Sequence, residues 1–131
     1  MATISRFEDL EIWKNARILY KNIRECTLLD NFSRDFTLKD QILRSSGSIM
    51  DNIAEGFGRE GNKEFIYFLS ISQGSCNEVQ SQLYRAYDSA YIDEKTRIQL
   101  HEQTKKIIAG IKALSKYLRK SELKGNKFKP A

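Results

Sequence analysis

The strongest constraint on the fold is an apolar seam along residues 62–90. Its members alternate steps of four and three for about four heptads, the spacing of one buried face on a long α-helix. The seam consists of Phe65, Leu69, Ser72, Cys76, Val79, Leu83, Ala86 and Ala90. A helix with such a face needs partners of similar length to cover it.

Three other segments carry the same spacing and are predicted to supply those partners: residues 7–29, 37–57 and 94–120. Asn62 and Asp93 are predicted N-caps, and Thr37 with Asp40 predicts an approximate capping box. The stretch Asp30-Asn31-Phe32-Ser33 is rich in turn formers and predicts a break. The apolar stripes of the three helices are Ile12, Ala16, Leu19, Ile23 and Cys26; Leu38, Ile42, Ser45, Ile49 and Ile53; and Leu100, Thr104, Ile107, Ile111, Leu114 and Leu118.

Four long helices joined by short polar loops predict an all-α fold, an up-down-up-down antiparallel four-helix bundle. A three-helix core with a swapped fourth helix is the main alternative. The small residues at 45–48 would let a neighbouring helix approach closely. No segment alternates with period two, so a sheet is not expected. We assign residues 1–120 to the bundle domain and residues 121–131 to a basic tail that is predicted to be disordered.

The net charge of +5 lies at the C-terminal end. From Lys116 onward the chain has six of its 22 basic residues and one of its 17 acidic ones, so the preceding part is neutral. A short cationic segment attracts phosphate backbones by releasing their counterions. The alternative is that these residues only keep a fraying end soluble. The candidate nucleic-acid contacts are Lys116, Arg119, Lys120, Lys124, Lys127 and Lys129.

Several classes of protein are excluded by the composition and patterning of the 131 residues. No apolar run approaches the ~18 residues of a membrane span. No basic segment followed by an apolar one marks a signal peptide. Cys26 and Cys76 fall on apolar stripes, where free cysteine behaves as a small hydrophobe. We therefore expect a cytoplasmic protein with reduced thiols.

No catalytic, cofactor-binding or metal-ligating residues are predicted, and the chain is not expected to be an enzyme. Residues 56–61 match G-x-G-x-x-G, but that fingerprint requires a preceding strand, so a helix-ending turn explains the glycines better. The single histidine, His101, is expected to be a partly exposed structural residue. The acidic pairs at 51 and 55 and at 60 and 64 have basic neighbours, which favours ion pairing over acid–base chemistry.

Aromatic residues outside the apolar stripes are more numerous than one small bundle requires. We predict that they form a subunit interface, where Trp and Tyr are enriched. They could instead pack on the rim of the core or form a stacking platform for bases. The surplus residues are Trp13, Tyr20, Tyr67, Tyr84, Tyr87 and Tyr91, and all of them except Tyr67 are named as interface residues.

The chain carries four short motifs: Gln41-x-x-Arg44; Ser48-Ile49-x-x-Asn52-Ile53-Ala54-Glu55-Gly56-x-Gly58-Arg59; Gly74-Ser75-x-x-Glu78; and Phe7-Glu8-Asp9-Leu10-x-Ile12-Trp13. The first two, in segment 41–59, resemble the signature of a four-helix bundle family named for reading frames in intervening sequences of bacterial 23S rRNA genes, the S23 type. The resemblance covers about residues 6–118. Met50 stands where relatives often have proline, so a straighter helix is expected here.

The resemblance implies a bundle that assembles into a ring-like homopentamer, and no known catalytic activity. It also implies kinship with accessory proteins of diversity-generating retroelements, which bind nucleic acid and a reverse transcriptase. We therefore expect a bacterial protein that binds RNA or DNA through phosphates without sequence readout; the alternative is a protein-interaction scaffold. The signature residues, expected to hold the second helix against its neighbours or an adjacent subunit, are Gln41, Arg44, Asn52, Glu55, Gly56 and Arg59.

Overall fold

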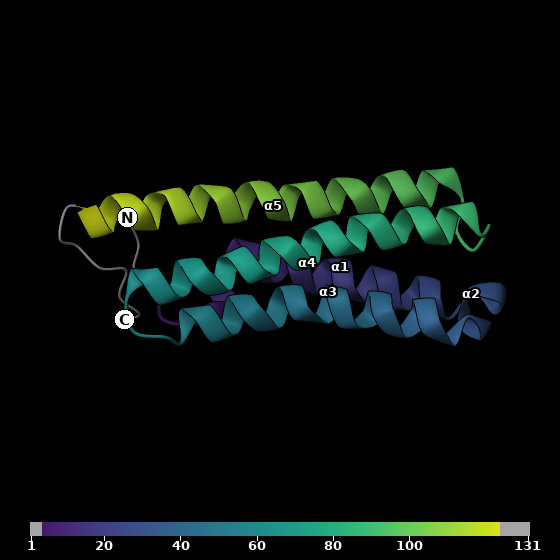
Figure 1. Cartoon of the computed structure of the whole chain (residues 1–131), viewed down its shortest axis with the longest axis horizontal. Helices are drawn as coiled ribbons and strands as arrows, with labels where there is room; N and C mark the ends of the chain where they lie inside the picture. Colours follow the sequence, from purple (N-terminus) through teal and green to yellow (C-terminus); the bar gives the residue numbers. More distant parts are fainter. Residues whose placement is uncertain (1–3, 124–131) are drawn as a thin grey trace.

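The computed structural model describes residues 4–123 as a set of helices (Figure 1). The elements are the 3-10 helix η1 (Phe7–Asp9) and the α-helices α1 (Glu11–Thr27), α2 (Asp30–Arg34), α3 (Phe36–Phe57), α4 (Asn62–Asp88) and α5 (Glu94–Leu123). No strand occurs within the described range. The all-α fold class is therefore confirmed.

The four long helices lie side by side, and short α2 lies at one end of them (Figure 1). Helix α3 packs against α1 and α4, and α5 packs against the other sides of the same two helices. Contacts between α4 and α5 join the start of each helix to the end of the other. Asn62 Nδ2 donates to the carbonyl oxygen of Leu118 over 3.2 Å, and the rings of Tyr84 and His101 lie 4.6 Å apart. Within this chain α5 thus covers α1 and α4.

The core is built from the four predicted stripes, and nearly all of their members are buried. Cys26 and Leu114 are only partly buried, although both pack against the core. Ala90 is exposed, because α4 ends at Asp88 and Ala90 has a φ of 61° in the turn that follows. Burial of these apolar side chains is the main source of the bundle's stability.

The small residues of α3 allow α4 to approach closely, as the sequence predicts. Ser48 Oγ and Ser75 Oγ lie 2.9 Å apart, and Ser72 Oγ donates to the carbonyl oxygen of Ile49 over 2.9 Å. Helix α3 continues through Met50 without interruption, which fits the absence of proline there. Hydroxyl groups therefore link the two helices along this stretch.

Two of the predicted caps are wrong. Asp35, not Thr37, caps α3, with its Oδ1 accepting from the backbone N–H of Leu38 over 3.0 Å. Asn62 lies inside α4, and Gly61 occupies the N-cap position with a φ of 87°, which favours glycine. Asp93 is confirmed as a cap, because its Oδ1 accepts from the N–H of Thr96 over 2.8 Å.

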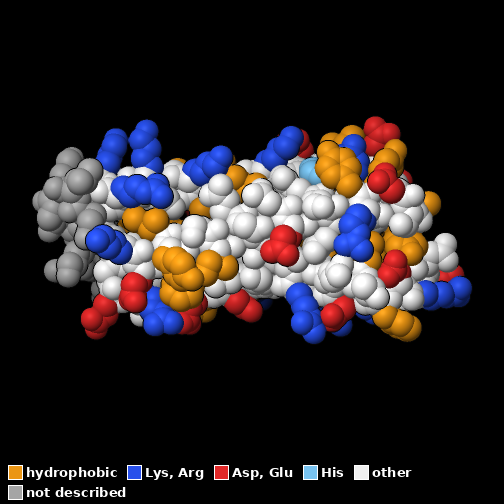
Figure 2. All heavy atoms as spheres, in the orientation of Figure 1, with side chains coloured by type: hydrophobic (Ala, Val, Ile, Leu, Met, Phe, Trp, Pro, Cys, Tyr) orange, Lys and Arg blue, Asp and Glu red, His pale blue; other side chains and the backbone are white. Residues whose placement is uncertain are grey.

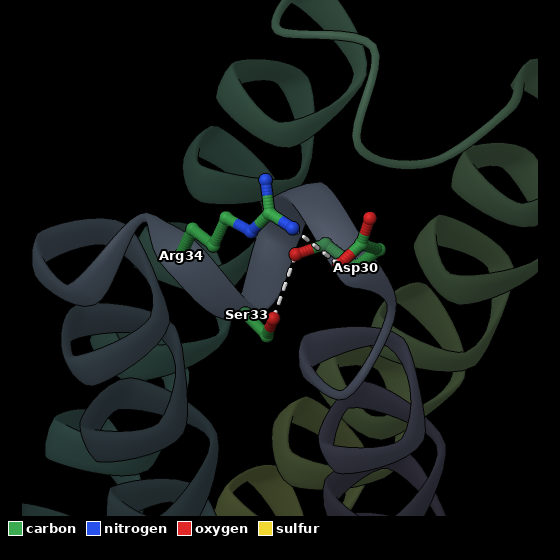
Figure 3. A network of polar contacts seen from close by, with 3 residues as sticks. All are labelled: Asp30, Ser33 and Arg34. Atoms are coloured by element: carbon green, nitrogen blue, oxygen red, sulfur yellow. Dashed lines mark hydrogen bonds and ion pairs between the residues drawn. The ribbon is translucent and has the colours of Figure 1, made fainter.

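The predicted break at residues 30–33 is instead the short helix α2 (Figure 3). Arg34 pairs with Asp30 over 3.1 Å, and Ser33 Oγ donates to the Asp30 carbonyl oxygen over 2.7 Å. Phe32 is only 1% exposed and stacks on Tyr91 with ring centroids 5.2 Å apart. Helix α2 therefore closes one end of the core.

The outer limits of the bundle also differ from the expected ones. The first helix was expected from residue 7, but η1 and the extended Leu10 precede α1. Helix α5 continues to Leu123, past the expected domain boundary at residue 120. Residues 124–131, and with them most of the expected tail, lie outside the described residues. No described helix is both long and apolar enough to span a membrane.

Candidate nucleic-acid interface

The solvent side of α5 carries a run of basic side chains, which Figure 2 shows along the upper edge of the molecule. The sequence has no acidic residue between Glu102 and Glu122. Within the described residues, the only ion pair in this run joins Lys105 to Glu102 over 3.6 Å. We call these exposed residues the α5 basic face: Lys105, Lys106, Lys112, Lys116, Arg119 and Lys120.

Four members of the α5 basic face form a line along the helix. Lys105, Lys112, Lys116 and Arg119 are separated by steps of seven, four and three, which keep them on one side of an α-helix. At 1.5 Å per residue the line is about 21 Å long. Such a line places several uncompensated positive charges beside one another, where a polyanion can contact them together.

Three of the six basic residues predicted from the sequence belong to this face. Lys116, Arg119 and Lys120 are exposed on α5, whereas Lys124, Lys127 and Lys129 lie outside the described residues. Lys105, Lys106 and Lys112 were missed, because charge was counted only from residue 116 onward. The acid-free stretch of the sequence was the signal that could have found them.

Next to this face, Arg97 lies between two tyrosine rings of α4. Its guanidinium carbon is 5.1 Å from the centroid of Tyr84 and 5.3 Å from that of Tyr87. No ion pair joins Arg97 to any described residue, and its buried Nε has no hydrogen-bond partner among them. The cation–π contacts thus position a guanidinium that forms no ion pair with a carboxylate of residues 4–123.

The expectation of a partly exposed His101 is wrong, because the residue is only 7% exposed. The ring of Tyr84 covers it at 4.6 Å. His101 Nδ1 lies 3.0 Å from the carbonyl oxygen of Arg97, which can only accept, so Nδ1 carries the proton. Its Nε2 is buried without a partner among the described residues.

The five aromatic residues expected at a subunit interface lie in separate places. Trp13 packs edge-on against Phe7, and Tyr91 donates to Asp35 Oδ2 over 2.9 Å while stacking on Phe32. The remaining three are Tyr20 in a groove between α1 and α3, and Tyr84 and Tyr87 around Arg97. Tyr84 is the most open of the five, at 51% exposed.

The polar signature residues make different kinds of contact. Gln41 reaches across to α4, where its Oε1 accepts from Arg85 Nη1 over 2.8 Å. Asn52 Nδ2 donates to Ser48 Oγ over 2.9 Å, and that hydroxyl contacts Ser75 of α4. Both residues therefore connect α3 with α4, directly or through one hydroxyl.

The charged signature residues pair locally. Arg44 forms an ion pair with Asp40, which lies one turn earlier on the same helix, over 3.0 Å. Glu55 pairs with Arg59 over 2.6 Å, and the Arg59 guanidinium also lies 5.0 Å from the centroid of Phe68 on α4. These exposed pairs contribute little to stability by themselves.

Gly56 is a point of close helix contact and not, as expected, part of the helix-ending turn. It lies buried within α3, and a Cβ added to it would lie 2.7 Å from Phe68 Cβ and 3.1 Å from Phe65 Cδ1. The start of α4 therefore packs directly on its backbone. Gly58 and Gly61 do terminate α3 and lead into α4.

Comparison with known proteins confirms the resemblance. The family model of the 23S rRNA-intervening sequence protein matches residues 8–113. A crystal structure from Bacteroides thetaiotaomicron, described as a protein of unknown function from the S23 ribosomal protein family, superposes with a TM-score of 0.73. The two chains are 23% identical over 80% of this chain and 98% of the other, so the likeness concerns the fold. None of the curated proteins compared with the chain matches it. Since the family model spans most of its length, the chain belongs to the 23S rRNA-intervening sequence protein family.

Proposed function

We propose that the chain is a small non-enzymatic subunit of a bacterial, cytoplasmic homo-oligomer that binds RNA or DNA. Each subunit is an up-down-up-down antiparallel four-helix bundle, and a basic tail follows α5, which ends at Leu123. Binding takes place through phosphate contacts and does not read the base sequence. Membership of a family named for rRNA intervening sequences supports the nucleic-acid context.

The observation that carries this proposal is the α5 basic face. Its lysine and arginine side chains are exposed and, apart from Lys105, make no ion pair with a described residue. A row of such side chains can contact successive phosphates of one strand and release condensed counterions. The described residues contain no group of three or more His, Cys, Asp or Glu side chains that could hold a metal ion.

Oligomerisation would strengthen weak phosphate contacts without adding new ones, because each subunit repeats the basic face and raises the effective concentration. The homopentamer implied by the family resemblance is our proposed assembly. The end of the bundle near α2 offers exposed apolar side chains for a subunit contact: Leu28, Leu29 and Phe36.

The test is the salt dependence of binding to duplex DNA and to structured RNA. We expect the variant Lys112→Gln, Lys116→Gln, Arg119→Gln to bind more weakly and to show a shallower salt slope. Each lost phosphate contact on duplex DNA lowers the slope by about 0.9 log unit per log unit of salt. The matched control removes the same charges from α1: Lys14→Gln, Lys21→Gln and Arg24→Gln. An unchanged slope in the α5 variant would contradict the proposed face.

The second candidate function is a protein-interaction scaffold without nucleic-acid binding. The exposed apolar end at Leu28, Leu29 and Phe36 favours it, because such side chains are typical of protein contacts. A reverse transcriptase is the partner that the resemblance implies. Absence of any gel shift at micromolar protein and physiological salt would favour the scaffold. Native mass spectrometry, with and without nuclease, would report the subunit number and any co-purifying nucleic acid together.

A further inference from the structure

An exposed tyrosine ring lies at one end of the α5 basic face. Tyr84 of α4 is 51% exposed, although two side chains of α5 hold it in place. The Arg97 guanidinium lies 5.1 Å from its centroid, and the tilted His101 ring lies 4.6 Å from it. Side chains of α5 therefore cover part of Tyr84, while about half of its surface remains exposed to solvent.

The guanidinium beside this ring is available to an anion. Arg97 contacts Tyr84 and Tyr87 but forms no ion pair with a described residue. Stacked arginines of this kind retain their outward N–H groups, which match the geometry of a phosphate. A ring for a base and a guanidinium for the adjoining phosphate thus lie side by side.

This pair continues the α5 basic face. Arg97, His101 and Lys105 are spaced by four residues and therefore lie on the same side of α5. A strand that contacts the lysines from Lys116 to Lys105 reaches Arg97 next, within about 12 Å of helix length. The row of basic side chains on α5 thus ends beside the ring of Tyr84.

We propose that Tyr84 and Arg97 bind one unpaired nucleotide, with the base stacked on Tyr84 and its phosphate held by Arg97. This inference rests on the proposed nucleic-acid binding and specifies the preferred ligand, a strand with unpaired nucleotides beside a duplex. Inside a duplex both faces of each base are covered by neighbouring bases, so away from the duplex ends only an unpaired base can stack on the ring. Stacking does not distinguish the four bases, which agrees with binding that does not read sequence.

The experiment compares two RNA probes by fluorescence anisotropy: a blunt duplex, and the same duplex with unpaired nucleotides at one 3′ end. We expect the wild-type protein to bind the probe with the overhang about tenfold more tightly, because only that probe offers an unpaired base to stack on the ring. Tyr84→Ala should abolish this preference and leave binding of the blunt duplex unchanged. Tyr84→Phe keeps the ring and should retain the preference.

Tyr67→Ala is the matched control, because Tyr67 is also an exposed tyrosine of α4, at 61%, and no arginine of residues 4–123 lies over its ring. It should leave the preference intact. A direct readout is 2-aminopurine at the first unpaired position, whose fluorescence should be quenched by the wild-type protein but not by Tyr84→Ala. Circular dichroism checks that each variant is folded.

The outcomes separate this inference from the proposed function. Equal affinity for the two probes, or a preference that survives Tyr84→Ala, would overturn the stacking site while leaving phosphate binding intact. Failure to bind either probe would overturn both. Loss of blunt-duplex binding in Tyr84→Ala would also count against the site, since it would assign Tyr84 a role in the phosphate contacts themselves.

Discussion

Gly110 of α5 lies directly against Ile12 of α1. A Cβ added to Gly110 would lie 2.6 Å from Ile12 Cγ2, well inside van der Waals contact. Ile12 is a buried core residue near the start of α1, so it has little room to withdraw. The contact between Gly110 and Ile12 therefore sets how closely α1 and α5 can approach each other.

Gly110→Ala is expected to destabilise the protein by about 1 kcal/mol. Overpacking a well-packed contact costs about 1–3 kcal/mol, which outweighs the ~1 kcal/mol that alanine gains over glycine within a helix. Urea denaturation monitored by circular dichroism measures the difference. Leucine has no methyl branch at Cβ, so adding Ile12→Leu to Gly110→Ala removes the Cγ2 atom that meets the new side chain. The double variant should recover part of the lost free energy of unfolding.

Gly74→Ala is the matched control for that experiment. Gly74 also lies inside a helix, but nothing would come within 4 Å of its added Cβ. We expect a gain of about 1 kcal/mol from helix propensity alone. Equal effects at the two glycines would show that the contact with Ile12 does not limit the approach of the helices.

Gly56→Ala is expected to cost more, about 2–3 kcal/mol. The new Cβ would be 2.7 Å from Phe68 Cβ, an atom next to the backbone, so α3 and the start of α4 would have to separate. Gly58→Ala is the nearby control, since its Cβ would meet only backbone oxygens at ordinary distances of 3.6 and 3.7 Å. Thermal unfolding of the two variants side by side should show a lower Tm for Gly56→Ala only.

The periodic stripes of the sequence predict the core well because burial along a long helix repeats at every turn. Ile42, Ile49 and Ile53 of α3 are all fully buried, as their spacing predicts. The glycine contacts were not predictable in this way. The closeness of Gly110 to Ile12 depends on which helices become neighbours, and one helix's pattern carries no information about its partner.

The end of the bundle and the candidate site were only partly predicted for the same reason. Phe32 lies in a segment of turn formers too short to show any period, yet it is buried against Tyr91. His101 lies at the flank of its stripe, and the ring of Tyr84, which comes from another helix, covers it. The distribution of charged residues along the sequence predicts the basic end of the chain. The contact between Tyr84 and Arg97 could not be predicted, because it depends on how α4 packs against α5.

The stability of the protein is expected to fall as the pH drops below about 4, with Asp35 contributing. The N–H of Leu38 and then the hydroxyl of Tyr91 donate to this carboxylate and hold its pKa below the ordinary 3.8. When the pKa of a carboxyl is lower in the folded than in the unfolded state, its ionised form stabilises the fold at any pH above the unfolded-state pKa. This stabilisation is lost as the pH falls through the folded-state pKa.

The Asp35→Ala variant tests this dependence. Its urea midpoint should lie below that of the wild type by a constant amount between pH 5 and 8, and the two midpoints should converge below about pH 4. Tyr91→Phe removes one of the two donors and should show a smaller effect of the same sign. Asp51→Asn, an exposed carboxylate on the same helix, is the control. A gap between wild type and Asp35→Ala that does not change with pH would refute the electrostatic contribution.

The two cysteines are expected to differ in reactivity, and the difference reports how the core opens. Burial raises the pKa of Cys76 to about 12, and its side chain is fully enclosed between the helices. The pKa of Cys26 is also raised, by burial and then by Glu25 and Asp93, but this thiol is partly exposed. Because the thiolate is the reactive form, a thiol reagent should label Cys26 slowly in the native protein and Cys76 only after opening of the bundle.

Labelling kinetics with a chromogenic disulfide reagent can separate the two sites. In Cys76→Ala the remaining thiol, Cys26, should react without denaturant. In Cys26→Ser the remaining thiol, Cys76, should react at a rate that increases with the urea concentration in proportion to the unfolding of the protein. In the Gly56→Ala background the Cys76 rate should increase, because a destabilised core opens more often. Rapid labelling of Cys76 in the absence of urea, unaffected by Gly56→Ala, would mean that the centre of α4 is not sealed by its neighbours.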